Sequence, residues 1–419
     1  MMVMLLVVFV LLLCCCHDVH SGVVSSDQIA GLQYFYNGTN GDYWVWSTDS
    51  NAGIPWSFSA TFSNISNPCV NEWQGVQCTP NCSNTPTCNI IGVSLDQHNI
   101  TGELPSKFLS LNAQLEVLSI QSNYLMGSLP SEIGLLSVLN TLNVQYNAFD
   151  GSILSYFNNV ISLRYVNLAY NKFTGTIPSD FFSQQNRTLE YFGLVHNPFS
   201  GSVPDSIGTL QVATLLRIGF NAMTGTIPTS VCLVTTLQFL AISINDYSGS
   251  IPPNIGNLQL LTFLALGGYD LITGTIPSGM GTLSSMIFLH ITGTFTGSFP
   301  PLASLNVITS LVISGSYMDI DTPALLDIVQ KPVLRNLVLR DNMFSGDFAG
   351  AQFSPSLEML QLSNNIFSGD TFLKLPSICN LSNLTLFSID ENSFSGSLPA
   401  CMDAWQMLEV LIVNNNYFT

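Results

Sequence analysis

The chain has few charged residues, and those that it has are mostly acidic. Lysine and arginine together number 9 against 26 aspartates and glutamates, which gives a formal net charge of −17. Proteins that bind phosphate backbones or anionic lipid surfaces carry patches of basic residues. So few cations cannot supply such a patch, and we therefore exclude nucleic acid as a partner.

Signatures of catalysis are also missing. The sequence contains no H-E-x-x-H pair of zinc ligands, no phosphate-binding P-loop, no G-x-S-x-G nucleophile turn and no kinase signature. His20, His98, His196 and His290 lie in different segments, so no two of them suggest a shared site. We expect a binding protein and not an enzyme, with no cofactor.

Only one long apolar run is present, and it opens the chain at residues 1–13. It is shorter than the ~20 helical residues that a membrane span requires. It fits the apolar core of a signal peptide, with Val19 and Ser21 as small residues before a cleavage site near Ser21 and Gly22. No lysine or arginine precedes it, which departs from the usual pattern. We assign residues 1–21 to a signal peptide and expect an extracellular protein, secreted or at the cell surface.

A repeated pattern fills most of the remaining chain. It reads L-x-x-L-x-L-x-x-N-x-φ-x-G-x-φ-P, where φ is apolar, as in residues 163–178. Its asparagine, here called the slot residue, recurs at Asn123, Asn147, Asn171, Asn197, Asn221, Asn245, Asn342, Asn365, Asn392 and Asn416, with His98 in the first repeat. This is the leucine-rich repeat pattern. It predicts an α/β solenoid, a right-handed superhelix of roughly fourteen repeats at residues 91–419 with a parallel sheet on its concave side.

The slot asparagine and the glycine that follows it have separate roles. An amide offers donors and an acceptor, so stacked asparagines can satisfy backbone groups that leave the sheet unpaired. Glycine and proline suit the turn that follows. The Thr/Ser-Gly-x-φ-Pro form of this turn resembles that of plant-type extracellular leucine-rich repeat proteins, and it recurs at Gly102, Gly127, Gly175, Gly201, Gly225, Gly249, Gly274 and Gly396.

Residues 22–90 should cap the first repeat, because a solenoid must cover its apolar end. Ser26 and Asp27 are candidate caps for a helix that Gly38 ends. The run 69–78, in which two cysteines bracket W-x-G-V, resembles the plant-type cap with a spacing wider by about two residues. Residues 40–44 resemble caps of algal and protist members. On this basis we pair Cys69 with Cys78 and Cys82 with Cys88, although four cysteines allow three connectivities.

Metal sites are not expected. A zinc site at Cys78, Cys82 and Cys88 would need a fourth ligand, and the next histidine downstream, His98, occupies the slot. Asp319, Asp321 and Asp327 lack the spacing of an EF-hand calcium loop.

Three cysteines lie within the repeats. Cys379 and Cys401 follow the proline of adjacent turns, so a disulfide between neighbouring repeats is plausible, whereas Cys232 has no such partner and should be a buried free thiol. Asn-x-Ser/Thr sequons, which are candidate N-glycosylation sites, begin at Asn37, Asn64, Asn81, Asn99, Asn186, Asn380 and Asn383.

The repeat register fails between residues 266 and 332. The slot there holds Tyr269 or Asp270, then Gly293, then Ser316, and the G-x-φ-P turn after Ser316 is replaced by a helix that Thr322 should cap. Two interpretations stay open: ordinary drift of the repeat, or an irregularity that shapes a ligand site.

Aromatic residues recur at two open positions of the predicted sheet. The position before the slot holds Tyr146, Tyr170, His196, Phe220 and Ile244, and the third position of the pattern holds Tyr165, Tyr191, Leu215, Phe239, Phe263 and Phe288. Such rows would be roughly 20–25 Å long and would suit an apolar peptide or a sugar polymer, although aromatic filler of the repeat is the alternative. The candidate ligand-binding residues are Tyr146, Tyr165, Tyr170, Tyr191, His196, Phe220, Arg164 and Arg217.

The resemblance implies the receptor-like ectodomain of a cell-surface protein that recognises an extracellular peptide, protein or carbohydrate, with a co-receptor as a further candidate partner. There are two alternatives. One is a secreted inhibitor of a cell-wall hydrolase, similar to polygalacturonase-inhibiting proteins, and the other is a structural matrix protein. The chain stops at Thr419, one residue before the glycine that the pattern demands. We therefore expect a longer protein, with a membrane anchor only if a further segment supplies it.

Overall fold

The computed structural model describes residues 23–49, 51–58, 67–80, 82, 87–268, 271–320, 322–370 and 375–419. The chain divides into two compact units, of which the first comprises Met1–Gly151 and Asn159–Leu163, and the second Ser152–Asn158 and Arg164–Thr419. The division falls within the repeats, and the predicted boundary at residue 90 stays a prediction. Several features that the sequence predicts lie outside the described residues. These are the signal peptide, the sequons at Asn64 and Asn81, the slot candidates Tyr269 and Asp270, and Asp321.

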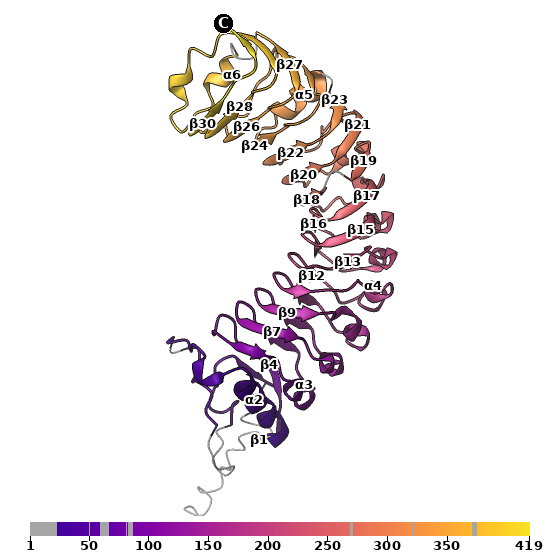
Figure 1. The fold of residues 1–419 in the computed structure, drawn as a ribbon, viewed down its shortest axis with the longest axis vertical. Helices are drawn as coiled ribbons and strands as arrows, with labels where there is room; N and C mark the ends of the chain where they lie inside the picture. The colour runs from indigo at the N-terminus through magenta and orange to yellow at the C-terminus, as the bar shows by residue number, and fades with distance from the viewer. Residues whose placement is uncertain are drawn as a thin grey trace, which may run out of the picture. The chain divides into compact units, whose positions relative to one another are not determined.

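The L-x-x-L-x-L segments form short strands that pair in register with the same segment of the next repeat. In the first unit these are β2 (Val76–Cys78), β4 (Ile90–Ser94), β6 (Val117–Ser119) and β8 (Thr141–Asn143), with β2 antiparallel to β4 and the others parallel. In the second unit they are β10 (Tyr165–Asn167), β12 (Tyr191–Gly193), β14 (Leu215–Arg217), β16 (Phe239–Ala241), β18 (Phe263–Leu266), β20 (Phe288–Thr292), β22 (Ser310–Ser314), β24 (Asn336–Val338), β26 (Met359–Gln361), β28 (Leu386–Ser388) and β30 (Val410–Ile412). Figure 1 shows the strands of the second unit following one another in chain order. We call this layer the main sheet. The predicted parallel sheet is confirmed.

A second layer of strands, which the sequence analysis did not predict, forms from the Thr/Ser-Gly turns. In the first unit it comprises β5 (Thr101–Glu103), β7 (Tyr124–Ser128) and β9 (Ala148–Gly151). In the second unit it comprises β13 (Ser200–Gly201), β15 (Ala222–Thr226), β17 (Asp246–Ser250), β19 (Ile272–Gly274), β21 (Thr294–Ser298), β23 (Tyr317–Asp319) and, further along, β25 (Ser345–Gly346), β27 (Ile366–Gly369), β29 (Ser393–Gly396) and β31 (Tyr417–Phe418). The strand β11 (Lys172–Phe173) begins this layer in the second unit. Where these strands pair, neighbouring repeats of one unit are joined by two sets of backbone hydrogen bonds, and among the described residues of the second unit this layer is interrupted between β23 and β25.

Short helices complete most of the repeats. They are α3 (Ser106–Leu111), η4 (Ser131–Leu135), η5 (Leu154–Asn159), α4 (Phe181–Gln184), η6 (Asp205–Thr209), η7 (Thr229–Leu233), η8 (Ile255–Asn257), η9 (Ser278–Thr282), α5 (Thr322–Val329), α6 (Pro376–Cys379) and η11 (Met402–Ala404). Five of these helices, α3, η4, η6, η7 and η9, begin directly after the proline of the turn, which has no N–H to lose and a fixed φ. The buried leucines of the pattern lie between these helices and the strands.

The helix α5 replaces the missing turn in the irregular region. It begins at Thr322 itself, so the predicted cap at Thr322 is wrong by one residue. Its Asp327 carboxylate lies 2.9 Å from the Nζ of Lys331, a lysine that is buried. Pairing explains why this lysine can be buried, since a buried charge needs a partner.

Six of the ten slot asparagines are buried and four are half-buried, and all ten donate from Nδ2 to backbone carbonyls, as predicted. Asn197 donates from Nδ2 to the carbonyls of Leu168 (2.9 Å) and Leu194 (3.0 Å), and its Oδ1 accepts from the N–H of Phe173 (2.9 Å). In the irregular region Ser316 occupies the slot and donates only to Gly293, at 2.7 Å. A hydroxyl cannot reproduce the whole set of bonds, because it has one donor where the amide has two.

The amino-terminal cap is built around α2 (Ser26–Gly38), which Ser25 caps by accepting a hydrogen bond from Gln28. Ser26 and Asp27 lie inside the helix, so the predicted capping residues are wrong by one or two positions, whereas the end at Gly38 is right. Phe35 of α2 stacks on Phe108 of α3, with ring centroids 4.7 Å apart. The remaining cap elements are β1 (Val23–Val24), η1 (Gly41–Tyr43) and β3 (Thr87–Cys88). The cap helix thereby covers the apolar end of the first repeats.

Cysteine pairing follows the predicted scheme. Disulfides join Cys69 to Cys78 and Cys82 to Cys88 in the cap, and Cys379 to Cys401 in adjacent repeats. Cys232 is a buried free thiol, and its burial raises its pKa to about 11. A thiol with so high a pKa is a poor nucleophile near neutral pH. Within the described part of the chain, no helix has both the length and the apolar character needed to span a membrane.

Candidate functional site: an aromatic groove on the main sheet

A groove of about 430 Å³ lies on the open face of the main sheet in the second unit. It runs across successive strands from β12 to β20. Its lining, largely apolar, comprises Tyr170, Val195, His196, Arg217, Gly219, Phe220, Phe239, Ala241, Ser243, Ile244, Phe263, Ala265, Phe288, His290 and Thr292. We call it the aromatic groove.

Small side chains make the floor of the groove. They occupy the fifth and seventh positions of the pattern, where Gly219, Ala241, Ser243 and Ala265 lie in successive repeats. Gly219 has no room for a side chain, since a Cβ there would lie 2.6 Å from the carbonyl oxygen of Ser243. Larger residues at the flanking positions stand above this floor, and the difference in size produces the depression.

One wall is a stack of phenylalanine rings at the third position of the pattern. Phe239 and Phe263 have centroids 4.0 Å apart and ring planes at 8°, and Phe263 and Phe288 are 4.4 Å apart at 3°. In-register parallel strands place these residues side by side, because their Cα positions are direct partners. Phe263 is covered on both faces by its neighbours and Arg217 lies over the ring of Phe239, so the wall presents mainly ring edges to the groove.

The opposite wall comes from the position before the slot. Tyr170, His196 and Phe220 stack there at 4.3 and 4.2 Å, and Ile244 follows in the next repeat. The backbone at all four positions is left-handed, with φ between 54° and 57°. Asparagine tolerates this conformation, whereas large and β-branched side chains are strained in it. The same backbone recurs before the slot in other repeats, where the residues include Ser122, Asp341, Asn364, Glu391 and Asn415, so the groove differs from most other repeats in the large side chains that it places there.

Replacing Ile244 with asparagine should therefore raise the free energy of unfolding by about 1 kcal/mol, because left-handed backbone costs a β-branched residue roughly 1–2 kcal/mol. Urea denaturation monitored by circular dichroism measures the change. The matched control is the reverse substitution, Asn364→Ile, which should lose a similar amount. A loss of stability in Ile244→Asn would show that packing of the isoleucine in the groove outweighs its backbone strain.

The groove carries positive but no negative charge among the residues that the structure describes. Arg217 is half-buried, its guanidinium carbon lies 5.7 Å from the ring centroid of Phe239, and it is hydrogen-bonded to Tyr191. Its Nε is buried and has no hydrogen-bond partner within the described residues. A buried donor without a partner is unfavourable, and a ligand oxygen could satisfy it.

Both histidines of the groove favour the neutral form. Burial lowers the pKa of His196, and the positive charge of Arg217 lowers it further. Burial also lowers the pKa of His290, with a second contribution from Arg340. Neutral imidazoles add to the apolar character of the walls near neutral pH.

The structure brings four of the eight predicted ligand-binding residues into the groove, namely Tyr170, His196, Phe220 and Arg217. Tyr165 and Tyr191 stack on each other at 4.2 Å outside its lining, and burial raises the pKa of Tyr191. Arg164 forms an exposed ion pair with Glu190. Tyr146 belongs to the first unit, where it lines a shallow pocket with Ser122, Asn123 and Tyr124.

Some residues that line the aromatic groove were not among the predicted ligand-binding residues. The third-position phenylalanines were recognised in the sequence but not selected, although three consecutive ones were a usable signal. His290 and Thr292 lie in a repeat whose register is irregular, and β20 is lengthened there to include them. The described sequon asparagines, Asn37, Asn99, Asn186, Asn380 and Asn383, are all absent from the lining of the groove.

Comparisons with known proteins agree with the repeat architecture. The family model described as Leucine Rich Repeat matches residues 114–136 and 162–183. Cuscuta receptor 1 of Solanum lycopersicum is 31% identical over 130 residues, which are 27% of this chain and 11% of that protein. This chain thus spans a small part of the curated relative.

Solved structures resemble the fold over a longer stretch. A TDR receptor has a TM-score of 0.66 and 28% identity, over 78% of this chain and 59% of that one. The plant peptide hormone receptor RGFR1, solved in complex with RGF2, has a TM-score of 0.66 and 25% identity, over 77% of this chain and 55% of that one. The chain therefore has a leucine-rich repeat solenoid fold and is similar, over part of their length, to receptors of plants.

Proposed function

We propose that the chain is the ligand-binding part of a receptor-like extracellular protein, and that the aromatic groove binds an extended apolar peptide. The observation that carries this proposal is the placement of Tyr170, His196, Phe220 and Ile244. These residues occupy strained backbone positions and together form one wall of a groove. Asparagine or glycine would suit this backbone better, so large residues at four successive positions along one groove favour a role in binding.

A peptide fits the walls better than a carbohydrate does. Sugar rings pack their C–H groups on open aromatic faces, which carry the negative part of the ring quadrupole. In the wall formed by Phe239, Phe263 and Phe288 those faces are covered by stacking. The exposed ring edges are the positive part, and they suit carbonyl oxygens and apolar side chains.

Arg217 supplies a polar contact within this apolar surface. Arg217 lines a groove without carboxylates among the described residues, so a peptide carbonyl or carboxylate is the matching group for its guanidinium. Peptide binding also agrees with the comparison to RGFR1, whose structure contains RGF2. The same proposal includes four further features of the protein. These are a co-receptor as partner, a signal peptide at residues 1–21, N-glycosylation at the sequons, and a cap like that of algal and protist members of the family.

The test uses a variant that removes the wall without weakening the fold. The double substitution Phe220→Asn and Ile244→Asn places asparagine in left-handed backbone that it tolerates, so the protein should stay folded. The full chain and the variant are panned against a displayed library of random linear peptides. Peptides selected on the full chain should bind the variant at least about tenfold more weakly, since two contact residues are lost.

Glu391→Asn is the matched control, because Glu391 has the same backbone conformation outside the groove. Its peptide binding should equal that of the unchanged chain. Two results would contradict the proposal: selected peptides that bind the double variant as well as the unchanged chain, or a chain that retains no peptide but binds oligosaccharides on an array.

A further inference from the structure

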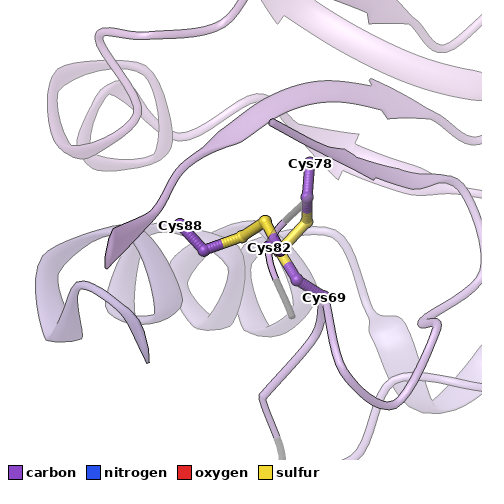
Figure 2. A group of neighbouring side chains, drawn as sticks. All are labelled: Cys69, Cys78, Cys82 and Cys88. Carbon is purple, nitrogen blue, oxygen red and sulfur yellow. A yellow bond between two sulfur atoms is a disulfide. The ribbon is translucent and has the colours of Figure 1, made fainter. Parts of the chain in front are cut away.

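Four cysteine sulfurs of the amino-terminal cap are gathered in one place. The sulfur atoms of Cys69, Cys78, Cys82 and Cys88 all lie within 4.8 Å of one another. Figure 2 shows the two disulfides that they form lying side by side. The sequence offered no fourth ligand beside Cys78, Cys82 and Cys88, and the fold supplies it by bringing Cys69 against the end of β2.

The four sulfurs lie within reach of a single zinc ion. Zinc takes four thiolates at about 2.3 Å in a tetrahedron, which places the sulfurs about 3.8 Å apart. All four sulfurs lie within 4.8 Å of one another, and once the two disulfides are reduced each bonded pair must separate by about 2 Å to reach this spacing. Cys78 and Cys82 are separated by three residues, within the usual interval for a pair of zinc ligands. We propose that the reduced cap binds one zinc ion through these four cysteines, and that oxidation to the two disulfides releases it.

A dithiol can reduce the two disulfides in a reaction that balances in atoms, electrons and protons. Two dithiol molecules transfer four electrons and four protons to the two disulfides, which become four thiols, and each dithiol closes into its own disulfide. Zinc then binds the four sulfurs and displaces four protons, because thiolates are the ligands. In the reverse reaction two molecules of a small-molecule disulfide accept the four electrons, take up four protons from solution and become dithiols, while the two cap disulfides re-form and the zinc ion is released.

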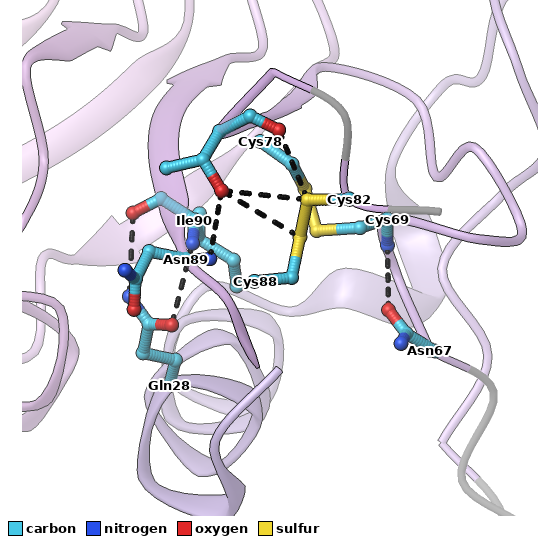
Figure 3. The surroundings of a disulfide bond; sticks show 9 residues. Gln28, Asn67, Cys69, Cys78, Cys82, Cys88, Asn89 and Ile90 are labelled. Atoms are coloured by element: carbon cyan, nitrogen blue, oxygen red, sulfur yellow. Dashed lines mark hydrogen bonds between the residues drawn. A yellow bond between two sulfur atoms is a disulfide. The ribbon is translucent and has the colours of Figure 1, made fainter. Parts of the chain in front are cut away.

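Neighbouring groups hold the cysteines in place in either state. The Oγ1 of Thr79 lies 3.4 Å from the sulfur of Cys82 and 3.9 Å from that of Cys88, so its hydroxyl can donate to a thiolate. Figure 3 shows Gln28 bonded to the backbone of Ile90, which fixes the strand after Cys88 to α2. Asn67 accepts from the N–H of Cys69 at 3.0 Å. These bonds do not depend on the disulfides.

The test uses the full chain, reduced with a phosphine under conditions that keep it folded. Cobalt(II) then replaces zinc as a spectroscopic probe, because tetrahedral thiolate ligation gives charge-transfer and ligand-field absorption that the free ion lacks. We expect one cobalt per chain, displaced by one equivalent of zinc, and no signal in the oxidised chain. The pair Cys379→Ser and Cys401→Ser is the matched control and should bind cobalt unchanged.

Two further variants separate ligation from folding. Replacing Cys69 and Cys82 with serine should weaken cobalt binding at least about 100-fold, because a lost ligand exceeds the roughly 10–100-fold effect of a lost outer partner. Thr79→Val keeps all four sulfurs and should weaken binding about tenfold while the fold, followed by circular dichroism, stays intact. Failure of the reduced, folded chain to bind cobalt, or unchanged binding without Cys69 and Cys82, would overturn the proposal.

Discussion

Replacing Asn245 with leucine should lower the free energy of unfolding by about 3 kcal/mol or more, although the two side chains are similar in size. Asn245 is 1% exposed. Its Oδ1 accepts from the N–H of Met223 (3.1 Å), and its Nδ2 donates to the carbonyls of Ile218 (3.1 Å) and Ile242 (3.2 Å). Leucine leaves these backbone groups without that partner, and each buried group left unsatisfied costs about 1–3 kcal/mol.

Urea denaturation of the full chain measures this loss. The control is Asn257→Leu in the helix η8 of the same repeat, where the asparagine is exposed and the change should stay within about 0.5 kcal/mol. A second variant, Asn245→Asp, keeps the acceptor and loses both amide donors, so it should also be strongly destabilised. If Asn245→Leu costs less than about 1 kcal/mol, the three backbone groups have other partners, and the slot asparagine does not hold the repeats together in the way described.

Replacing Phe35 with alanine should cost about 3–5 kcal/mol and should loosen the cap and the repeats beside it. Phe35 is fully buried between Trp44, Trp56 and Phe108, with centroid distances of 5.3, 6.2 and 4.7 Å. Because each repeat of a solenoid is stabilised by its neighbours, a defect in the cap should act first on the repeats next to it.

Hydrogen exchange followed by mass spectrometry can resolve where the loss occurs. Amides of α2, α3, β4 and β6 should lose protection, whereas those of β24, β26 and β28 should keep it. Tyr34→Ala is the control, since Tyr34 is the preceding residue of the same helix and is 49% exposed. Equal loss of protection along the whole chain would show that the defect is not confined to the repeats near the cap.

The main sheet was predictable because the pattern encodes it directly. Buried leucines and slot asparagines recur at fixed spacing, and each has one role in every repeat, as Asn197 and Asn245 show. The second layer was not predicted because its strands contain glycine and are short, both of which weaken a strand signal. Threonines at alternate positions, such as Thr224 and Thr226 of β15, were the available sign.

The groove was predictable in its rows but not in its depth. Alternation along β16 indicates that Phe239 points to the open face, whereas Phe220 lies beyond the end of β14, at a left-handed residue where alternation no longer applies. Depth depends on the small residues between the rows, such as Ala241 and Ala265, which carry no signal of their own. In the irregular repeats the sequence does not show which residue occupies which position of the pattern, so His290 and Thr292 were not recognised as groove residues. The cap at Ser25 was missed because three consecutive residues, Ser25, Ser26 and Asp27, are all good caps.

The left-handed wall of the groove affects how this protein can be engineered. A consensus sequence for the repeat would place asparagine or glycine before every slot, because averaging favours the residue that suits the backbone. Such a design would be more thermostable, and it would erase Tyr170, His196, Phe220 and Ile244 in one step. Selection of new binding specificities at these four positions should therefore begin from a chain stabilised elsewhere, so that it can tolerate the strain that recognition requires.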